Sequence, residues 1–294
     1  MKTTKNILIA FILNLAFSIF EFAGGIFTGS VAIISDSVHD MGDAASIGIS
    51  YFLEKKSKNG PDEKYTYGYA RFSVVGSLIT TVILIFGSCA VILNAAKRII
   101  YPTDINYDGM IIFAVIGIIV NCLAAFFTRE GDSLNQKAVN LHMLEDVLGW
   151  VVVFIGAIVM RFTDISLIDP IMSVAVSVFI LINAIKNLKA ITDLFLEKMP
   201  NGIDIDEIKE HIFHIEGIKD IHHIHVRSID GINNCATMHI VTDRDAAEIK
   251  KLVREELHEH GICHATLEIE GENEDCIDKH CHIEVKTSHC CHGH

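Results

Sequence analysis

The fold is decided by the stretch SVAIISDSVHDMGDA at residues 30–44, which opens a long apolar segment and yet carries four ionisable side chains. A second apolar segment reads LHMLED at residues 141–146. Both stretches contain the pattern H-x-x-x-D. Ionisable groups inside a membrane span cost several kcal/mol, so they are functional candidates by default. The two stretches therefore predict a membrane protein with a polar site inside it.

Six stretches are long and apolar enough to cross a bilayer, since a spanning helix needs about 20 mostly apolar residues. They lie at approximately 7–27, 31–53, 73–95, 109–128, 140–160 and 168–188. The first run is too long for a signal peptide, contains Asn14 and Glu21, and lacks a clear cleavage motif. We expect an α-helical membrane protein with six transmembrane helices.

The charge is distributed unevenly along a chain of 294 residues whose formal net charge is −13. Residues 1–200 hold 17 acids and 15 bases, whereas residues 201–294 hold 20 acids and 9 bases. The second part also holds 14 of the 16 histidines and six of the eight cysteines. The acidic balance excludes a basic nucleic-acid binder, and the apolar content of 50% excludes intrinsic disorder.

Met-Pro-Asn-Gly at residues 199–202 is the best domain boundary, because proline and glycine stop the preceding helix. We expect a membrane domain at 1–199, a soluble domain at 200–271 and a ligand-rich tail at 272–294. Basic residues gather beside the amino terminus and the second and fourth loops, which predicts cytoplasmic termini. The expected location is a bacterial-type inner membrane, in a multi-pass arrangement. Cytoplasmic cysteines are kept reduced, which favours metal binding over disulfides.

The H-x-x-x-D spacing places His39 and Asp43 on one helical face, and likewise His142 and Asp146. Two such faces would supply two imidazole nitrogens and two carboxylate oxygens, a set that suits tetrahedral Zn²⁺. One such pair in a soluble helix is weak support for a metal site. Two pairs in separate spans are hard to explain as packing, so we predict a shared site.

In the soluble part, the spacing of apolar residues changes between a helical period and a strand period, and this predicts the order α-β-β-α-β. Helical spacing covers 203–215 and 246–260, and strand patterns cover 218–226, 236–240 and 265–269. This order suggests a small C-terminal α+β ferredoxin-like cytoplasmic domain.

The last 19 residues carry nine cysteine and histidine ligands without a spacing that would specify a rigid four-ligand finger. We interpret them as a flexible metal-binding tail, with an acidic tail of incidental ligands as the alternative. The ligands are Cys276, His280, Cys281, His282, His289, Cys290, Cys291, His292 and His294.

These motifs together resemble the cation diffusion facilitator family, and the resemblance covers about residues 5–270. The motifs occur in the expected order: Gly-Ser-Val-Ala at 29–32, Asp36 to Asp43, Tyr-Thr-Tyr-Gly-Tyr-Ala-Arg-Phe at 65–72, His142 to Asp146, Asp-Pro-Ile at 169–171, and Leu-Glu to Pro at 196–200. The resemblance implies metal efflux from the cytoplasm by proton antiport and alternating access in a homodimer, and no enzyme activity.

By residue match, the family's four transport ligands fall on His39, Asp43, His142 and Asp146. The presence of histidine at two of these four positions resembles the ligand set of zinc-preferring members. Family positions for cytoplasmic metal binding fall on His222, His239, Glu268 and Glu270. A further metal site found in the second loop of some members is not expected, because Tyr65 and Tyr69 stand at its histidine positions and leave Asp62 alone.

Zn²⁺ is thus expected as the transported substrate and as a regulatory ligand, and H⁺ as the ion transported in the opposite direction. The lipid bilayer is expected to surround the membrane domain, and no prosthetic group is expected. Cd²⁺, Co²⁺ and Ni²⁺ fit similar ligands. Two alternatives stay open at the level of the sequence. A membrane metalloenzyme would need an open metal position and a general base, and a membrane-anchored sensor or scaffold would leave the intramembrane ligands without a role.

Overall fold

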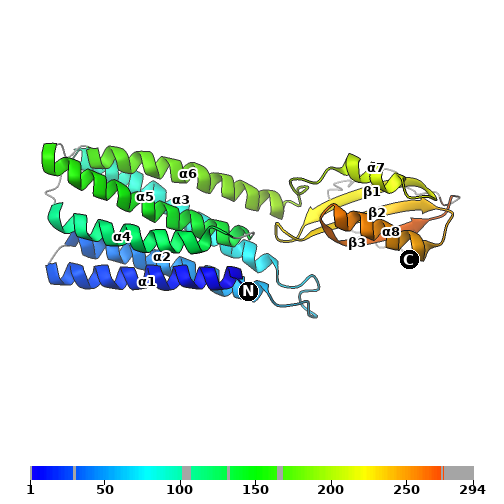
Figure 1. The fold of residues 1–294 in the computed structure, drawn as a ribbon, viewed down its shortest axis with the longest axis horizontal. Helices are drawn as coiled ribbons and strands as arrows, with labels where there is room; N and C mark the ends of the chain where they lie inside the picture. The colour runs from blue at the N-terminus through cyan, green and yellow to red at the C-terminus, as the bar shows by residue number, and fades with distance from the viewer. Residues whose placement is uncertain are drawn as a thin grey trace, which may run out of the picture. The chain divides into compact units, whose positions relative to one another are not determined.

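The computed structural model describes residues 2–28, 31–100, 107–130, 133–163, 168–272 and 274. The chain divides into two compact units, Met1–Leu196 and Glu197–His294. The first unit is helical and the second is a mixed α/β domain (Figure 1).

The described residues of the first unit form six long helices, which lie alongside one another in Figure 1. Helix α1 packs on α2 and α4, α4 packs on α5, and α3 packs on α6. The bounds are α1 Lys2–Thr28, α2 Val31–Ser57, α3 Arg71–Ile100, α4 Tyr107–Thr128, α5 Leu134–Thr163 and α6 Ile168–Phe195.

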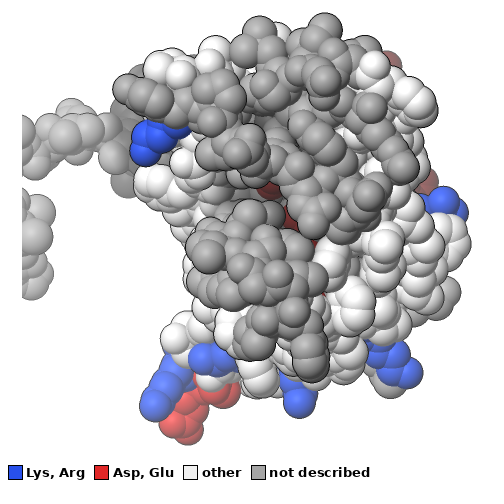
Figure 2. Space-filling view, turned by 90° about the vertical axis from the view of Figure 1, so that its left-hand side faces the viewer, with Lys and Arg blue, Asp and Glu red and all other residues white. Residues whose placement is uncertain are grey.

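Within the described ranges, four helices are apolar and long enough to cross a membrane: α1, α3, α4 and α5. Helix α2 is less apolar because it carries Asp36, Asp40 and Asp43. In Figure 2 most of the described surface of the bundle consists of uncharged residues, and acidic residues are visible in a recess near its centre. These observations confirm a multi-pass membrane body.

Helix α5 begins at Leu134, six residues before the expected span. The hydroxyl of Ser133 accepts a hydrogen bond from the backbone N–H of Gln136, which caps the helix start. The first turns are polar but buried: Asn135 and Gln136 are both 0% exposed. A search for apolar residues misses such turns, because the side-chain amides of Asn135 and Gln136 donate hydrogen bonds inside the bundle.

A close approach between α4 and α5 depends on Gly117. A Cβ atom at this position would lie 2.6 Å from the ring of Trp150, well inside van der Waals contact. The same indole ring packs edge-on against Phe17 of α1, with the ring centroids 5.5 Å apart. One small residue and one large ring thus join three helices.

The second unit follows the order α7 Ile205–Phe213, β1 Ile218–Ser228, β2 Asn234–Thr242, α8 Ala246–Glu259 and β3 Ile262–Glu270. This confirms the α-β-β-α-β order over the described residues. The strand order in the sheet is β1-β2-β3, with β1 antiparallel and β3 parallel to β2. Asp204 and Asp245 cap α7 and α8 by accepting from backbone N–H groups of the first turns.

One hydrophobic core joins both helices of the second unit to one face of the sheet. The helices contribute Ile208, Ile212, Ile249, Val253 and Leu257, and β2 contributes Met238 and Ile240. His239 lies between those two β2 residues, so alternation along the strand turns it to the opposite face. The sheet therefore separates a helix-covered face from a face with polar side chains.

Strand β1 departs from the simple alternation expected of residues 218–226. A bulge shifts the register between His222 and His225, and His223 adopts a left-handed conformation with φ 51°. An extra residue in one strand bends it and re-aims its side chains. As a result His222 and His223 both come close to His239, with ring centroids at 5.3 and 4.8 Å.

Candidate metal centres

The first candidate centre lies inside the helical unit, where Asp43, His142 and Asp146 converge. Their ligand atoms all lie within 4.8 Å of one another. Asp43 comes from α2, and the other two come from α5, one helical turn apart. His39 also lies in α2, but its side chain is outside the described part of the structure. Three of the four expected ligands are thus brought together.

The side chains of this centre are buried, and some of their polar atoms have no hydrogen-bond partner among the described residues. Asp43 is 7% exposed and His142 is 4% exposed. Nε2 of His142 lies 3.7 Å from Oδ2 of Asp43, and neither ring nitrogen of His142 has a hydrogen-bond partner among the described residues. A buried polar atom without a partner is costly. A divalent cation bound by the imidazole and the carboxylates would satisfy these atoms together.

The neighbouring acid Glu145 has a separate role between helices. The hydroxyl of Ser88 on α3 donates to Oε1 of Glu145 on α5, at 3.0 Å. Glu145 directly precedes Asp146 in sequence and therefore lies on a different face of α5. The side chain of Asp36 lies outside the described part of the structure.

The second candidate centre is on the sheet face opposite the two helices. It consists of His222 on β1, His239 on β2 and Glu270 at the end of β3, with ligand atoms within 4.8 Å of one another. Nδ1 of His239 lies 2.5 Å from Oε1 of Glu270, and Nε2 of His222 lies 3.2 Å from Oε2 of Glu270. Pairing of adjacent strands brings the three together: His222 is opposite His239, and Val241 is opposite Glu270.

The contact between His222 and Glu270 is close without being a hydrogen bond. Nε2 of His222 and Oε2 of Glu270 are both buried, and neither has a hydrogen-bond partner in the described structure. Two ligands on a tetrahedral zinc are about 3.4 Å apart when the bonds are about 2.1 Å long. Their separation therefore fits a shared cation. Glu268 lies at the edge of this centre, 3.3 Å from Nε2 of His239, with its side chain 67% exposed.

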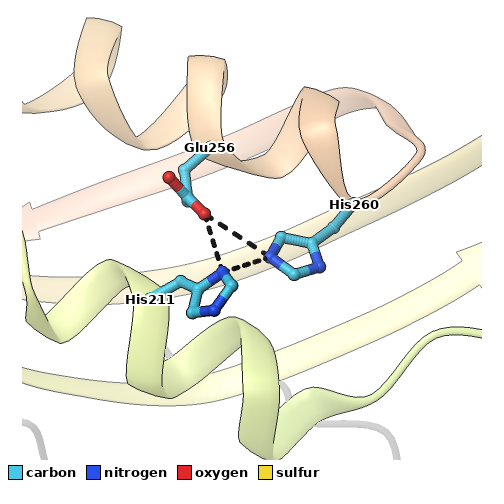
Figure 3. Close-up of side chains that lie close together, drawn as sticks. All are labelled: His211, Glu256 and His260. Atoms are coloured by element: carbon cyan, nitrogen blue, oxygen red, sulfur yellow. Dashed lines mark hydrogen bonds and ion pairs between the residues drawn. The ribbon is translucent and has the colours of Figure 1, made fainter.

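A third cluster was not expected from the sequence. It consists of His211 on α7, Glu256 on α8 and His260 at the C-cap of α8. The ligand atoms of these three residues lie within 4.8 Å of one another (Figure 3). The four-residue spacing of Glu256 and His260 is visible in the sequence. What the sequence cannot show is that α7 places His211 beside that pair.

In the loop after α2, Asp62 uses both carboxylate oxygens within the loop. Oδ1 accepts from the backbone N–H groups of Lys64 and Tyr65, and Oδ2 accepts from the hydroxyl of Tyr69 at 2.6 Å. The Tyr69 hydrogen bond, followed by that from Tyr65, lowers the pKa of Asp62 below its ordinary value of 3.8. All nine ligands of the expected metal-binding tail lie outside the described residues.

Comparison with known proteins gives two family matches that cover most of the chain. Residues 7–195 match a cation efflux transmembrane domain, and residues 200–272 match a cation efflux protein cytoplasmic domain. The first match alone covers more than half of the 294 residues.

Individual relatives extend over nearly the whole chain. The zinc transporter ZitB of Yersinia pseudotuberculosis is 32% identical over 92% of this chain and 88% of its own length. A cadmium, cobalt and zinc/H⁺-K⁺ antiporter of Bacillus subtilis is 30% identical over 91% of this chain and 89% of its own length. The metal cation efflux system protein CzcD of Cupriavidus metallidurans is 29% identical over 90% of this chain and 86% of its own length.

Proposed function

The chain belongs to the cation efflux family and is a divalent metal cation efflux transporter rather than an enzyme; on that premise we propose that it exports Zn²⁺ in exchange for H⁺. The single observation that supports zinc as the cargo is the intramembrane cluster of Asp43, His142 and Asp146. Mixed imidazole and carboxylate ligands suit Zn²⁺, whereas oxygen-only sites suit harder cations. Cd²⁺ and Co²⁺ are further candidate cargoes, since both occur in the name of the Bacillus subtilis relative.

Proton coupling follows from the same ligands. Zn²⁺ needs a neutral imidazole and ionised carboxylates, so a metal ion that enters the site displaces protons and a proton that enters displaces metal. An unperturbed histidine titrates near pH 6.5, in the range where both ions can compete. A site that opens alternately to either side would then exchange metal for protons, by rocking of helices around a fixed midplane position.

We propose the full ligand set as His39, Asp43, His142 and Asp146. The three described members support this assignment by their convergence, and His39 joins them by its one-turn spacing from Asp43. Four protein ligands leave little room for a metal-bound water, which disfavours a metalloenzyme. A membrane-anchored sensor would leave this buried set without a role.

We also propose that the chain crosses a bacterial-type inner membrane six times, with both termini in the cytoplasm. The second unit would have a ferredoxin-like fold. Residues 1–199 would transport, residues 200–271 would form the cytoplasmic domain, and residues 272–294 would collect metal. A homodimer belongs to this proposal, and it is supported by the match of residues 200–272 to the cytoplasmic domain of the family. His222, His239, Glu268 and Glu270 would bind a regulatory metal ion in that domain.

The test is zinc uptake by proteoliposomes with an imposed pH gradient. Vesicles with an acidic interior should accumulate Zn²⁺ as protons leave down their gradient, and a protonophore should abolish the accumulation. Substitution of Asp146 by Asn should abolish uptake, while the control substitution Glu130→Gln, at an exposed position after α4, should leave it unchanged. Uptake that is insensitive to the protonophore would reject proton exchange, and uptake by the Asp146 variant would reject the site.

A further inference from the structure

We propose that His211, Glu256 and His260 form an additional metal-binding site, for a divalent cation of the zinc class, on the helix-covered side of the C-terminal domain. The cluster has two imidazole nitrogens and one carboxylate oxygen, the borderline ligands that suit Zn²⁺. It lies outside both centres described above and shares no residue with them.

The distances among the three ligand atoms fit one bound cation. Nδ1 of His211 lies 3.0 Å from Oε1 of Glu256 and 2.9 Å from Nε2 of His260, and Nε2 of His260 lies 3.5 Å from the same Glu256 oxygen. Ligands on a tetrahedral zinc with bonds of about 2.1 Å are about 3.4 Å apart. Figure 3 shows the three atoms facing a common point between the helices.

Hydrogen bonds alone cannot satisfy all three of these ligand atoms when both imidazoles are neutral. The carboxylate oxygen accepts only, and each facing ring nitrogen is either a donor or an acceptor. If Nδ1 of His211 carries the proton, that one proton has to serve both Oε1 of Glu256 and Nε2 of His260. A cation at the centre would instead accept a lone pair from each of the three atoms.

Two secondary-structure elements hold the ligands in place. Glu256 and His260 are one turn apart at the end of α8, and His211 lies in the last turn of α7. Both helices are anchored on the same core, through Ile212 beside His211 and Leu257 beside Glu256. A metal ion here would join α7 to α8 across the surface of that core.

Exposure distinguishes this site from a closed structural zinc site. The side chains of His211, Glu256 and His260 are 46%, 25% and 15% exposed. Three protein ligands leave a fourth position for water, so the ion could exchange with the surrounding solution. The second centre is on the opposite face of the sheet, because the core residues Met238 and Ile240 flank His239 on β2. The two sites can therefore fill independently.

The test measures histidine modification on the full chain in detergent, with buffered free Zn²⁺ as the probe. Diethyl pyrocarbonate modifies unligated imidazoles, and peptide mass spectrometry reads each histidine separately. At free zinc about ten times the dissociation constant, modification of His211 and His260 should fall about tenfold. The exposed His225 and His264 should react equally with and without zinc.

Variants on both helices show whether the protection comes from one shared ion. Glu256→Gln should remove zinc protection from His211 and His260, and His211→Asn should remove it from His260. The matched control Glu255→Gln, at an exposed position one residue away, should keep it. Continued zinc protection of His222 and His239 in each variant would show that the domain remains folded.

Two outcomes would overturn the site. One is zinc that protects His222 and His239 while His211 and His260 react at the metal-free rate, which would identify the three-residue cluster as a hydrogen-bonded contact. The other is protection of His211 and His260 that survives in the Glu256 and His211 variants. Neither outcome affects the transport proposal, which depends on the intramembrane cluster and on vesicle uptake.

Discussion

Nε2 of His142 on α5 lies 3.7 Å from Oδ2 of Asp43 on α2, with both side chains almost completely buried. This distance is too long for a hydrogen bond and close to the separation of two ligands on one metal ion. The relationship crosses a helix–helix interface, so any movement of α2 against α5 changes the ligand geometry. It would thus link metal binding to the helix motion of the proposed alternating-access cycle.

Substitution of Asp43 by Asn should abolish zinc-dependent proton flux in proteoliposomes. The amide keeps the volume of the side chain but cannot supply the negative charge that offsets Zn²⁺ in a buried site. A pH-sensitive dye inside the vesicles reports the flux, because exchange for incoming Zn²⁺ removes protons from the vesicle interior. Flux at the unmodified rate would remove Asp43 from the ligand set.

Substitution of His142 by Asp should shift the metal preference away from zinc. Replacement of a nitrogen ligand by a carboxylate oxygen favours harder cations such as Mn²⁺. The ratio of zinc to manganese uptake should fall by about tenfold or more, which corresponds to about 1.4 kcal/mol. Competition uptake with both metals measures the ratio directly, and an unchanged ratio would mean that His142 does not contact the cargo.

Substitution of Asn135 by Ala should destabilise the helical unit. Nδ2 of Asn135 donates to the carbonyl of Ser50 at 3.0 Å and to Oε2 of Glu54 at 3.3 Å, and Oε2 also accepts from the Ser73 hydroxyl. Asn135 and Glu54 are both 0% exposed. Removal of one partner from a buried polar group costs about 1–3 kcal/mol.

Thermal unfolding in detergent, followed by the loss of helical circular dichroism, should show a lower midpoint for this variant. The control Asn59→Ala removes the same side chain from an exposed position in the loop after α2 and should leave the midpoint unchanged. Equal midpoints for Asn135→Ala and the unmodified chain would show that the hydrogen bonds of Asn135 contribute no net stability.

The Asp62–Tyr69 hydrogen bond should persist over the whole physiological pH range. It lowers the pKa of Asp62 below 3.8 and, as the main cause, raises the pKa of Tyr69 above 10.0. A lowered carboxyl pKa gives stability that is lost only as the pH falls through the folded pKa. A raised phenol pKa gives stability that is lost only as the pH rises through the folded pKa.

Phenolate absorbance of the full chain reports this contact during alkaline titration. Asp62→Asn should let one tyrosine ionise at a lower pH than in the unmodified chain, while Glu63→Gln, at the neighbouring exposed position, should not. Identical titration curves for all three chains would contradict the hydrogen bond.

The local patterns of the sequence were enough to predict the helices of the membrane body and the order of elements in the second unit. The span expected at 109–128 corresponds to α4 at Tyr107–Thr128, because most of its residues are apolar. The start of α5 was predicted too late, because its first turns are polar yet buried. The bulge at His223 was missed, because a register shift depends on the partner strand.

By itself, the sequence determined which residues are the candidate metal ligands of the helical unit, because a one-turn spacing of histidine and aspartate fixes a shared helical face regardless of the rest of the fold. Only the tertiary structure decided which faces meet. Packing of α2 on α5 brings Asp43 to His142, and a common core brings His211 beside Glu256 and His260. Such encounters depend on contacts between distant segments, which no local periodicity encodes.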